Sequence, residues 1–170
     1  MDFAAYVRDI KDFPKQGVIF KDITPLLNNP EALARACEAL CGFTTNMKID
    51  KVVGVDSRGF IFAPMLAERL QAGFVPVRKK GKLPYKTVSE SYDLEYGSET
   101  LEIHTDAIKK GEKVLIHDDV LATGGTASAV CKLVEKLGGE VVQCNFLVEL
   151  TFLDGAKKLN GYQIEALLQY

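Results

Sequence analysis

The chain has 170 residues, of which 47% are hydrophobic and 26% are charged, so we expect a single globular domain that spans residues 1–170 and buries a substantial core. Its 21 Lys and Arg residues are dispersed and outnumbered by 23 Asp and Glu residues, for a net charge of -2, which argues against a nucleic-acid-binding protein. The sequence contains no apolar run long enough to span a membrane, and its first residues lack the basic start and apolar core of a signal peptide, so we expect a cytoplasmic protein with no membrane partner.

The N-terminal part of the chain predicts two helices separated by an extended segment. Helical spacing of apolar residues predicts a short first helix over residues 2–10. Residues 17–25 are expected to be extended, with the charged pair Lys21 and Asp22 at their middle. A second helix is expected over about residues 30–40. On the residues alone, Lys21 and Asp22 are a solvated ion pair on a strand.

Residues 51–60, Lys-Val-Val-Gly-Val-Asp-Ser-Arg-Gly-Phe, predict a strand, a turn and a helix start, with the helix continuing over residues 63–70. The apolar run is typical of a parallel strand that is covered on both faces. Asp56, Ser57 and Arg58 come where this strand ends, and open parallel sheets bind ligands at that edge. Arg58 is therefore either a ligand for an anion or a surface residue that caps the turn.

Residues 73–79 predict a further strand, which runs into a basic segment over residues 80–90 with little apolar periodicity. This segment is either a solvated basic loop or a mobile lid that folds over an anionic substrate. The cluster consists of Arg78, Lys79, Lys80, Lys82 and Lys86.

Residues 91–104 alternate in character around Gly97 and Ser98, which predicts a β-hairpin with Gly97 at its turn. Together with the basic segment, the hairpin forms an expected flexible lid over about residues 79–105. On the residues alone, Glu95 is an exposed acid of this hairpin.

Residues 114–128 predict a strand, an acidic turn and the start of a helix with an anion site at its N-terminus. The backbone N–H groups of Gly124 and Gly125 can approach a ligand closely, and Thr123 and Thr126 add hydroxyl donors where the helix dipole favours a phosphate.

Asp118 and Asp119 precede this loop and can accept hydrogen bonds from two neighbouring sugar hydroxyls. A phosphate site beside a diol site indicates a phosphoribosyl ligand.

The rest of the chain is expected to be scaffold. Residues 140–150 predict a buried strand, residues 154–160 a short helix or turn, and residues 162–168 an edge strand. Cys37, Cys41, Cys131 and Cys144 are too scattered for a disulfide framework and have no histidine at ligand spacing, so we expect reduced thiols and no metal site held by the protein. His104 and His117 are expected to pack or to face solvent. Strands that alternate with helices predict an α/β fold with a mostly parallel twisted sheet flanked by helices.

Residues 114–126 resemble the 5-phosphoribosyl 1-diphosphate (PRPP) signature of the type I phosphoribosyltransferases. Residues 13–26, Phe-Pro-x-x-Gly-Val-Ile-Phe-x-Asp-Ile-Thr-Pro-Leu, are similar to the purine-covering hood of the adenine phosphoribosyltransferases, and the hood is expected over about residues 1–30. The hairpin sequence Tyr-x-Leu-Glu-Tyr-Gly matches a motif of the same family. The family commonly has Arg where this chain has Lys21, and Lys lacks the planar fork that a stacking role would need.

The resemblance implies transfer of the phosphoribosyl group of PRPP to N9 of adenine, giving AMP and diphosphate in purine salvage. Mg²⁺ is expected, held mainly by PRPP and water, and a homodimer is implied. The implied catalytic residues are Glu95, Arg58 and Tyr96. The expected ligands of the 5-phosphate and ribose are Asp118, Asp119, Ala122, Thr123, Gly124, Gly125 and Thr126, those of the diphosphate are Asp56, Ser57, Arg58, Arg78 and Lys79, and those of adenine are Ile19, Phe20, Lys21 and Leu150.

Two alternatives remain on sequence grounds. One is a phosphoribosyltransferase for another purine base, against which the hood and the hairpin motif argue. The other is a PRPP-sensing regulator that binds nucleic acid, which predicts an added binding segment or a basic face that this acidic chain does not offer.

Overall fold

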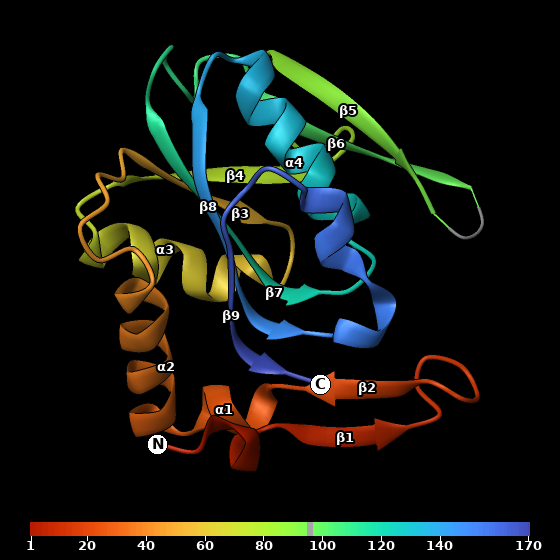
Figure 1. Ribbon diagram of the computed structural model, residues 1–170. Coiled ribbons are helices and arrows are strands. Elements are labelled where there is room, and N and C mark those ends of the chain that lie inside the picture. Colours follow the sequence, from red (N-terminus) through yellow and green to blue (C-terminus); the bar gives the residue numbers. More distant parts are fainter. Residues whose placement is uncertain (95–96) are drawn as a thin grey trace. The chain divides into compact units, whose positions relative to one another are not determined.

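The computed structural model describes residues 1–94 and 97–170 of the chain (Figure 1). The described residues form two compact units, Met1–Ala39 and Leu40–Tyr170. Residues 95 and 96, which include the expected catalytic carboxylate Glu95 and its neighbour Tyr96, lie outside them.

The first unit is built around a small antiparallel ladder. It contains a 3₁₀ helix η1 (Phe3–Tyr6), strands β1 (Arg8–Lys11) and β2 (Ile19–Asp22), helix α1 (Thr24–Asn28) and most of helix α2 (Pro30–Gly42). The α2 helix confirms the second expected helix. The extended segment predicted over residues 17–25 is extended only over β2, because α1 already begins at Thr24.

The helix predicted over residues 2–10 is wrong beyond Tyr6. Residues 8–11 instead pair with β2, and Arg8 donates from Nε and Nη2 to Asp22 Oδ2 at 3.0 and 2.6 Å. The helical spacing of the apolar residues was a weak local preference, and the strand pairing with a segment further along the chain overrides it.

The second unit contains one sheet of seven strands in the order β5-β6-β4-β3-β7-β8-β9. Strands β4, β3, β7, β8 and β9 are parallel to one another, whereas β5 and β6 form an antiparallel hairpin whose β6 strand pairs with β4. The mostly parallel sheet, the hairpin and the edge position of the last strand are as predicted. The strand bounds are β3 (Lys51–Val55), β4 (Gly73–Lys79), β5 (Thr87–Asp93), β6 (Ser98–His104), β7 (Lys113–Leu121), β8 (Glu140–Glu149) and β9 (Ile164–Gln169).

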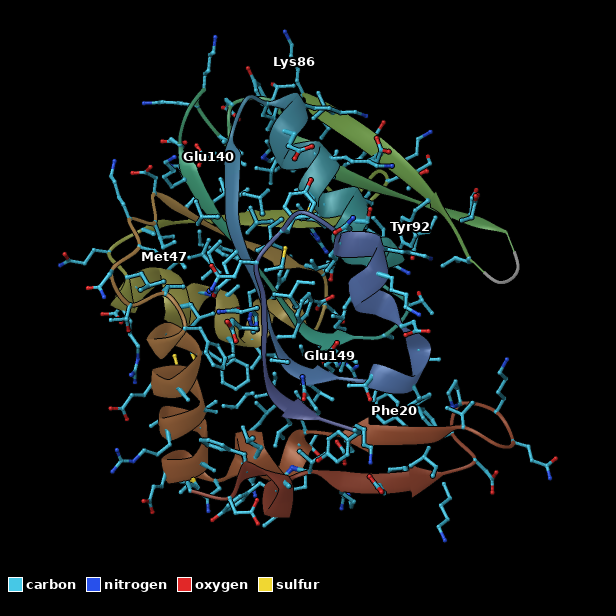
Figure 2. The ribbon with its side chains drawn as sticks, viewed as in Figure 1. Phe20, Met47, Lys86, Tyr92, Glu140 and Glu149 are labelled. Carbon is cyan, nitrogen blue, oxygen red and sulfur yellow. The ribbon has the colours of Figure 1, made fainter. Side chains whose placement is uncertain are left out.

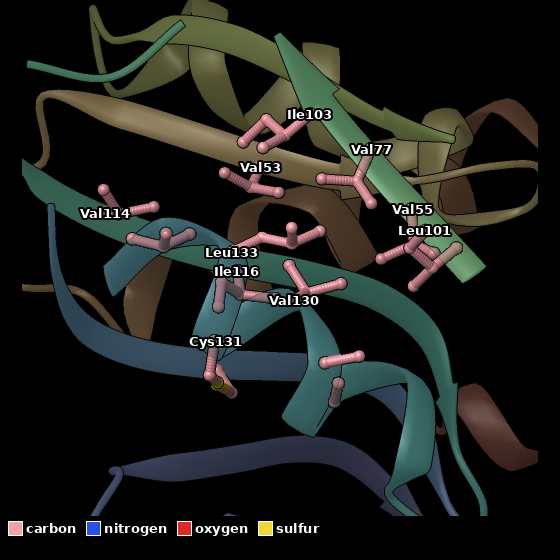
Figure 3. Packing of buried hydrophobic residues seen from close by; sticks show 14 of the residues in the cluster. Val53, Val55, Val77, Leu101, Ile103, Val114, Ile116, Val130, Cys131 and Leu133 are labelled. Atoms are coloured by element: carbon pink, nitrogen blue, oxygen red, sulfur yellow. The ribbon is translucent and has the colours of Figure 1, made fainter. Parts of the chain in front are cut away.

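Two helices cover opposite faces of this sheet. Helix α3 (Gly59–Arg69) connects β3 to β4, and helix α4 (Gly125–Lys136) connects β7 to β8. Because side chains alternate along a strand, Val114 and Ile116 of β7 face α4, whereas His117 faces α3 and lies edge-on to Phe62. Figure 3 shows the α4 side of this core, in which α4 residues pack against strand residues that include Val53, Val77, Ile103, Val114 and Ile116.

Short elements close the unit. The 3₁₀ helices η2 (Thr151–Leu153) and η3 (Gly155–Leu159) link β8 to β9, and η3 lies in the segment where a short helix or turn was predicted. The basic segment over residues 80–90 was predicted to be a solvated loop or a mobile lid. Its last residues belong to β5, because Thr87 to Glu90 pair with β6. Within the described ranges, the structure has no helix long and apolar enough to cross a lipid bilayer.

Candidate active site

Polar residues at the carboxyl ends of β3, β4 and β7 meet at one edge of the sheet. Asp118 and Asp119 were predicted to lie in a turn, but they belong to β7, because the strand pairs with β8 as far as Leu121. The three strands are parallel neighbours, so their carboxyl ends lie together. They border a cavity of about 250 Å³, and most of the residues predicted to bind ribose and diphosphate lie on its wall. The lining consists of Val55, Asp56, Ser57, Arg58, Lys79, Tyr92, Glu99, Leu101, Asp118, Asp119 and Thr126.

The turn after β3 places Arg58 against the acidic pair of β7. Asp56 and Ser57 are joined by a cis peptide bond, and Arg58 directly precedes the first residue of α3. Arg58 Nε lies 2.7 Å from Asp119 Oδ2, and the Asp119 side chain is only 6% exposed. The predicted diphosphate turn and the predicted ribose ligands are therefore in direct contact through this ion pair.

Gly59 allows this close approach, although no role was predicted for it from the sequence. A Cβ atom at Gly59 would lie 2.9 Å from Asp118 Oδ1 and 3.1 Å from the His117 carbonyl oxygen. The first turn of α3 thus rests on β7 beside the acidic pair. The glycine that ends Asp-Ser-Arg-Gly indicated a turn. Only the structure shows that the absent side chain leaves room for Asp118 and for the His117 carbonyl.

The two acids of β7 share one buried environment. Burial, reinforced by the negative charge of Asp119, raises the pKa of Asp118 well above its usual range. Burial also raises the pKa of Asp119, although the Arg58 guanidinium opposes this effect. Asp118 Oδ1 accepts a hydrogen bond from the backbone N–H of Asp119 at 2.9 Å. Asp119 is therefore the acid that its surroundings favour in ionised form.

Beneath these acids, His117 is fully buried and belongs to the packing of the sheet, in line with its expected role. Its Nδ1 lies 2.8 Å from Asn145 Oδ1, which can only accept, so Nδ1 carries the proton. Burial lowers the pKa of His117 to about 4, which keeps the ring neutral.

The loop between β7 and α4 has a shape that only glycine fits. Gly124 adopts the left-handed conformation with φ of 78°, and a Cβ atom there would lie 2.2 Å from the Gly155 carbonyl oxygen. The N-terminal end of α4 follows at Gly125, so its free N–H groups open onto the loop. The loop encloses a small hollow of about 70 Å³, lined by Asp118, Val120, Leu121, Ala122, Thr123, Gly124, Thr126 and Ala127.

The basic residues at the end of β4 are held by carboxylates. Arg78 Nε donates to Asp56 Oδ2 at 2.8 Å, and Lys79 Nζ lies 2.5 Å from Glu99 Oε1 of β6. This hydrogen bond and charge from Lys79 lower the pKa of Glu99. Asp56 and Lys79 line the cavity, and Arg78 is held next to it by its bond to Asp56. The role of these residues toward a diphosphate stays a prediction.

Tyr92 and Glu99 of the hairpin were not predicted. They are directly opposite each other in the β5–β6 register, and both line the cavity. The alternation of the hairpin was a signal that these residues share a face, but nothing in the sequence indicated which face lies over the site.

The residues predicted to bind adenine lie in both units. Ile19, Phe20 and Lys21 belong to β2 in the first unit, where Phe20 is edge-on to Phe13 with ring centroids 5.2 Å apart, and Lys21 Nζ lies 2.7 Å from Asp9 Oδ1. Leu150 follows β8 in the second unit, and its N–H donates to the Leu121 carbonyl at 2.9 Å. Their role toward a purine stays a prediction, as do those of Glu95 and Tyr96.

The described part of the chain has no group of three or more His, Cys, Asp or Glu side chains arranged to hold a metal ion. The cavity does present carboxylate oxygens, which are the kind of donor that Mg²⁺ prefers. This donor set fits an ion that takes most of its ligands from a phosphate substrate and from water.

Comparison with known proteins agrees with this geometry. The sequence profile of the phosphoribosyl transferase domain matches residues 23–160. An adenine phosphoribosyltransferase from Christiangramia forsetii is 66% identical over 100% of this chain and 99% of its own length.

Solved structures are similar over the whole fold. The adenine phosphoribosyltransferase of Rhodothermus marinus superposes with a TM-score of 0.95 at 57% identity, covering 99% of this chain and 96% of that one. The Saccharomyces cerevisiae enzyme, solved with an imino-altritol bisphosphate and adenine, has a TM-score of 0.92 at 42% identity, covering 98% and 97% of the two chains. The chain therefore belongs to the phosphoribosyltransferase family and, within it, to the adenine phosphoribosyltransferases.

Proposed function

We propose that this chain transfers the 5-phosphoribosyl group of PRPP to N9 of adenine, giving AMP and diphosphate for purine salvage. The observation that carries the proposal is a cavity lined by a buried acidic pair, by Arg58 and Lys79 and by Thr126 of the loop before α4, with the hollow of that loop beside it. High identity to adenine phosphoribosyltransferases over the full chain supports the choice of base.

The 5-phosphate binds in the loop over residues 122–126. The N–H groups at the N-terminus of α4 and the hydroxyls of Thr123 and Thr126 supply donors, and the helix dipole favours the negative charge. Gly124 and Gly125 carry no side chain, so the loop backbone can approach the phosphate. Gly124 must also be glycine because a Cβ atom there would collide with the Gly155 carbonyl.

The ribose lies over Asp118 and Asp119, which accept hydrogen bonds from its two hydroxyls. When the bond between the anomeric carbon and diphosphate breaks, positive charge develops on the ribose ring, and carboxylates nearby stabilise it. Arg58 contacts Asp119 and so favours its ionised form.

The leaving diphosphate gains negative charge as it departs, and Arg58, Arg78 and Lys79 neutralise it. Ser57 contributes a backbone N–H from the turn after β3, and Asp56 holds Arg78 in place through its 2.8 Å hydrogen bond. A bound Mg²⁺ would supply further charge neutralisation on the diphosphate. Asp118 and Asp119 are the carboxylates that could accept hydrogen bonds from its water ligands.

Adenine stacks on Phe20, and the backbone near Ile19 reads its edge. Lys21 keeps the positive charge of the hood but not the planar fork of an arginine. A protonated Glu95 donates to N7 and so meets the charge that accumulates on the purine as N9 attacks, while Tyr96 helps to position the reacting groups. We also infer a homodimer, which sedimentation of the purified chain would test.

The proposed function is tested by measuring PRPP-dependent diphosphate release, base by base and with Mg²⁺, for the wild type and for Glu95→Gln. Release with adenine alone, strongly reduced in the variant, is the expected result. Adenine turnover that the substitution leaves unchanged would keep the enzyme and discard Glu95 as the acid. Release with hypoxanthine, guanine or xanthine instead would reassign the base, and PRPP binding without release would indicate a regulator.

A further inference from the structure

Tyr92 of β5, whose position Figure 2 shows, joins the hairpin to the phosphate loop. The Tyr92 hydroxyl accepts a hydrogen bond from Thr126 Oγ1 at 2.9 Å and donates one to Glu99 Oε2 at 2.8 Å. None of the roles proposed above uses Tyr92 or Glu99.

The same contacts continue to the diphosphate side of the cavity. Glu99 Oε1 lies 2.5 Å from Lys79 Nζ, so Glu99 holds the Tyr92 phenol with one oxygen and the Lys79 ammonium with the other. An unbroken series of polar contacts therefore runs from Thr126, at the start of α4, across the hairpin to the end of β4.

Packing fixes the Tyr92 ring beside the loop, and the hydroxyl adds the hydrogen bond to Thr126. The ring lies against the hydrophobic core, and a Cβ atom at Gly125 would be 3.0 Å from Tyr92 Cδ2. Burial raises the pKa of Tyr92, so the phenol keeps its proton and remains a donor at neutral pH.

Thr126 and Tyr92 each have one hydroxyl proton, so each hydroxyl can donate only one hydrogen bond at a time. In the structure the Thr126 proton points to Tyr92. A phosphate oxygen in the loop that accepts the Thr126 proton takes it away from Tyr92. Tyr92 can then turn its own proton from Glu99 to Thr126 Oγ1, and every proton stays on the oxygen that carries it.

We propose that Tyr92 is a positioning residue that fixes the β5–β6 hairpin on the phosphate loop, and that its hydroxyl turns from Glu99 to Thr126 when a phosphate monoester binds. The inference rests on the proposed function, because it assigns the loop to the 5-phosphate of PRPP. Glu95 follows Tyr92 by three positions in the sequence, so the placement of Tyr92 bears on the step that Glu95 is proposed to assist.

Tyr92→Phe tests the proposal, because it keeps the ring and removes only the hydroxyl. We expect kcat to fall about 10-fold, while the KM for PRPP changes less than about 3-fold, since the other donors of the loop remain. The thermal midpoint should stay near that of the wild type.

A double-mutant cycle with Thr126→Val identifies the partner through which Tyr92 acts. If Tyr92 acts through Thr126, the double variant has the kcat of the lower single variant. In a Thr126→Ser background, which keeps the hydroxyl, Tyr92→Phe should lower kcat by the same factor as it does in the wild type.

Tyr162→Phe is the matched control. The Tyr162 hydroxyl also donates to a carboxylate, Glu135 Oε1 at 2.6 Å, and its ring also packs on the core. It should keep wild-type kinetics. Wild-type kinetics for Tyr92→Phe, or losses that simply add in the double variant, would overturn the inference while adenine turnover by the wild type upholds the proposed function. A wild-type chain without adenine turnover would overturn the proposed function itself.

Discussion

The loop to which we assign the 5-phosphate and the cavity wall to which we assign the diphosphate are built by different means. The loop, which is the phosphate half of the proposed site, is shaped by backbone, with Gly124 in a left-handed conformation pressed against the Gly155 carbonyl. The wall, which is the diphosphate half, is shaped by side chains, with Arg78 and Lys79 each held by a carboxylate.

This difference determines what each half can do. Backbone donors that are already in place bind a phosphate with little rearrangement, and a group that stays attached throughout the reaction needs a fixed site. Side chains in ion pairs can exchange one anion for another, which suits a group that must leave. The following substitutions test this division, and the first is expected to have the largest effect.

Gly124→Ala should disable the backbone-built half. The new Cβ would lie 2.2 Å from the Gly155 carbonyl oxygen, and the alanine would have to adopt a φ of 78°. We expect kcat/KM for PRPP to fall more than about 100-fold, or about 3 kcal/mol. Gly111→Ala is the matched control, because Gly111 has a φ of 83° but no atom within 4 Å of its Cβ position. Steady-state kinetics of both variants would show whether the collision or the backbone strain is responsible, and equal losses would contradict the steric account.

His117→Asn tests the buried layer that supports the backbone-built half. The native pKa of His117 is about 4, below its ordinary value of 6.5, so between these pH values the unfolded chain binds a proton that the native chain does not. The stability that comes from the neutral ring is therefore complete above pH 6.5 and is lost as the pH falls toward 4.

Between pH 7 and pH 4.5 this group should lower the free energy of unfolding by about 2.5 kcal/mol, and the variant should lack that part of the decline. Urea unfolding of both proteins at the two pH values measures it. Parallel declines in the wild type and the variant would show that His117 is not the group responsible.

Arg58→Gln tests the ion pair that joins the two halves. Removing the guanidinium leaves Asp119 buried without its cation, so the pKa of Asp119 should rise further and the acidic limb of the activity profile should move to higher pH. We expect kcat/KM for PRPP to fall about 30-fold, or about 2 kcal/mol. Arg35→Gln, which removes an exposed pair with Glu38 at 3.1 Å, should leave activity unchanged. A pH profile of Arg58→Gln that keeps its acidic limb in place would refute the link to Asp119.

Glu90→Gln should have the smallest effect. Glu90 pairs with Lys132 and Lys136 of α4 at 3.4 and 2.6 Å, and both lysines are about half exposed. Such pairs contribute less than about 1 kcal/mol, so urea unfolding should detect little and adenine turnover should match the wild type. A large loss of activity would mean that ion pairs outside the cavity also affect adenine turnover.

The parts of the fold that were predicted from the sequence are those in which local pattern and tertiary environment agree. The apolar runs before Asp56 and Asp118 had to be buried on both faces, and each was followed by a turn and a helix. The same runs brought Asp56 and the Asp118–Asp119 pair to one sheet edge, although that pair lies within β7 and not in the predicted turn. The grouping of these residues could therefore be predicted from the spacing of their motifs.

The parts that were missed depend on contacts between distant segments. The spacing of Phe3, Val7 and Ile10 suits a helix, but residues 8–11 pair with β2. Nothing in the sequence indicates that the Gly155 carbonyl lies against Gly124. The pairing of Tyr92 with Glu99 likewise follows only from the hairpin register. A one-dimensional pattern does not encode these partners.

The contact between Gly124 and Gly155 also bears on the order in which the chain can become competent during synthesis. A nascent chain made only as far as α4 already contains the whole PRPP signature, but it lacks Gly155, whose backbone packs against Gly124 of the loop. The N–H of Leu150 adds a second tie, since it closes on Leu121 just before the loop. If the loop binds PRPP as proposed, we expect it to do so only after η3 has been synthesised, so that partial translation products do not bind PRPP.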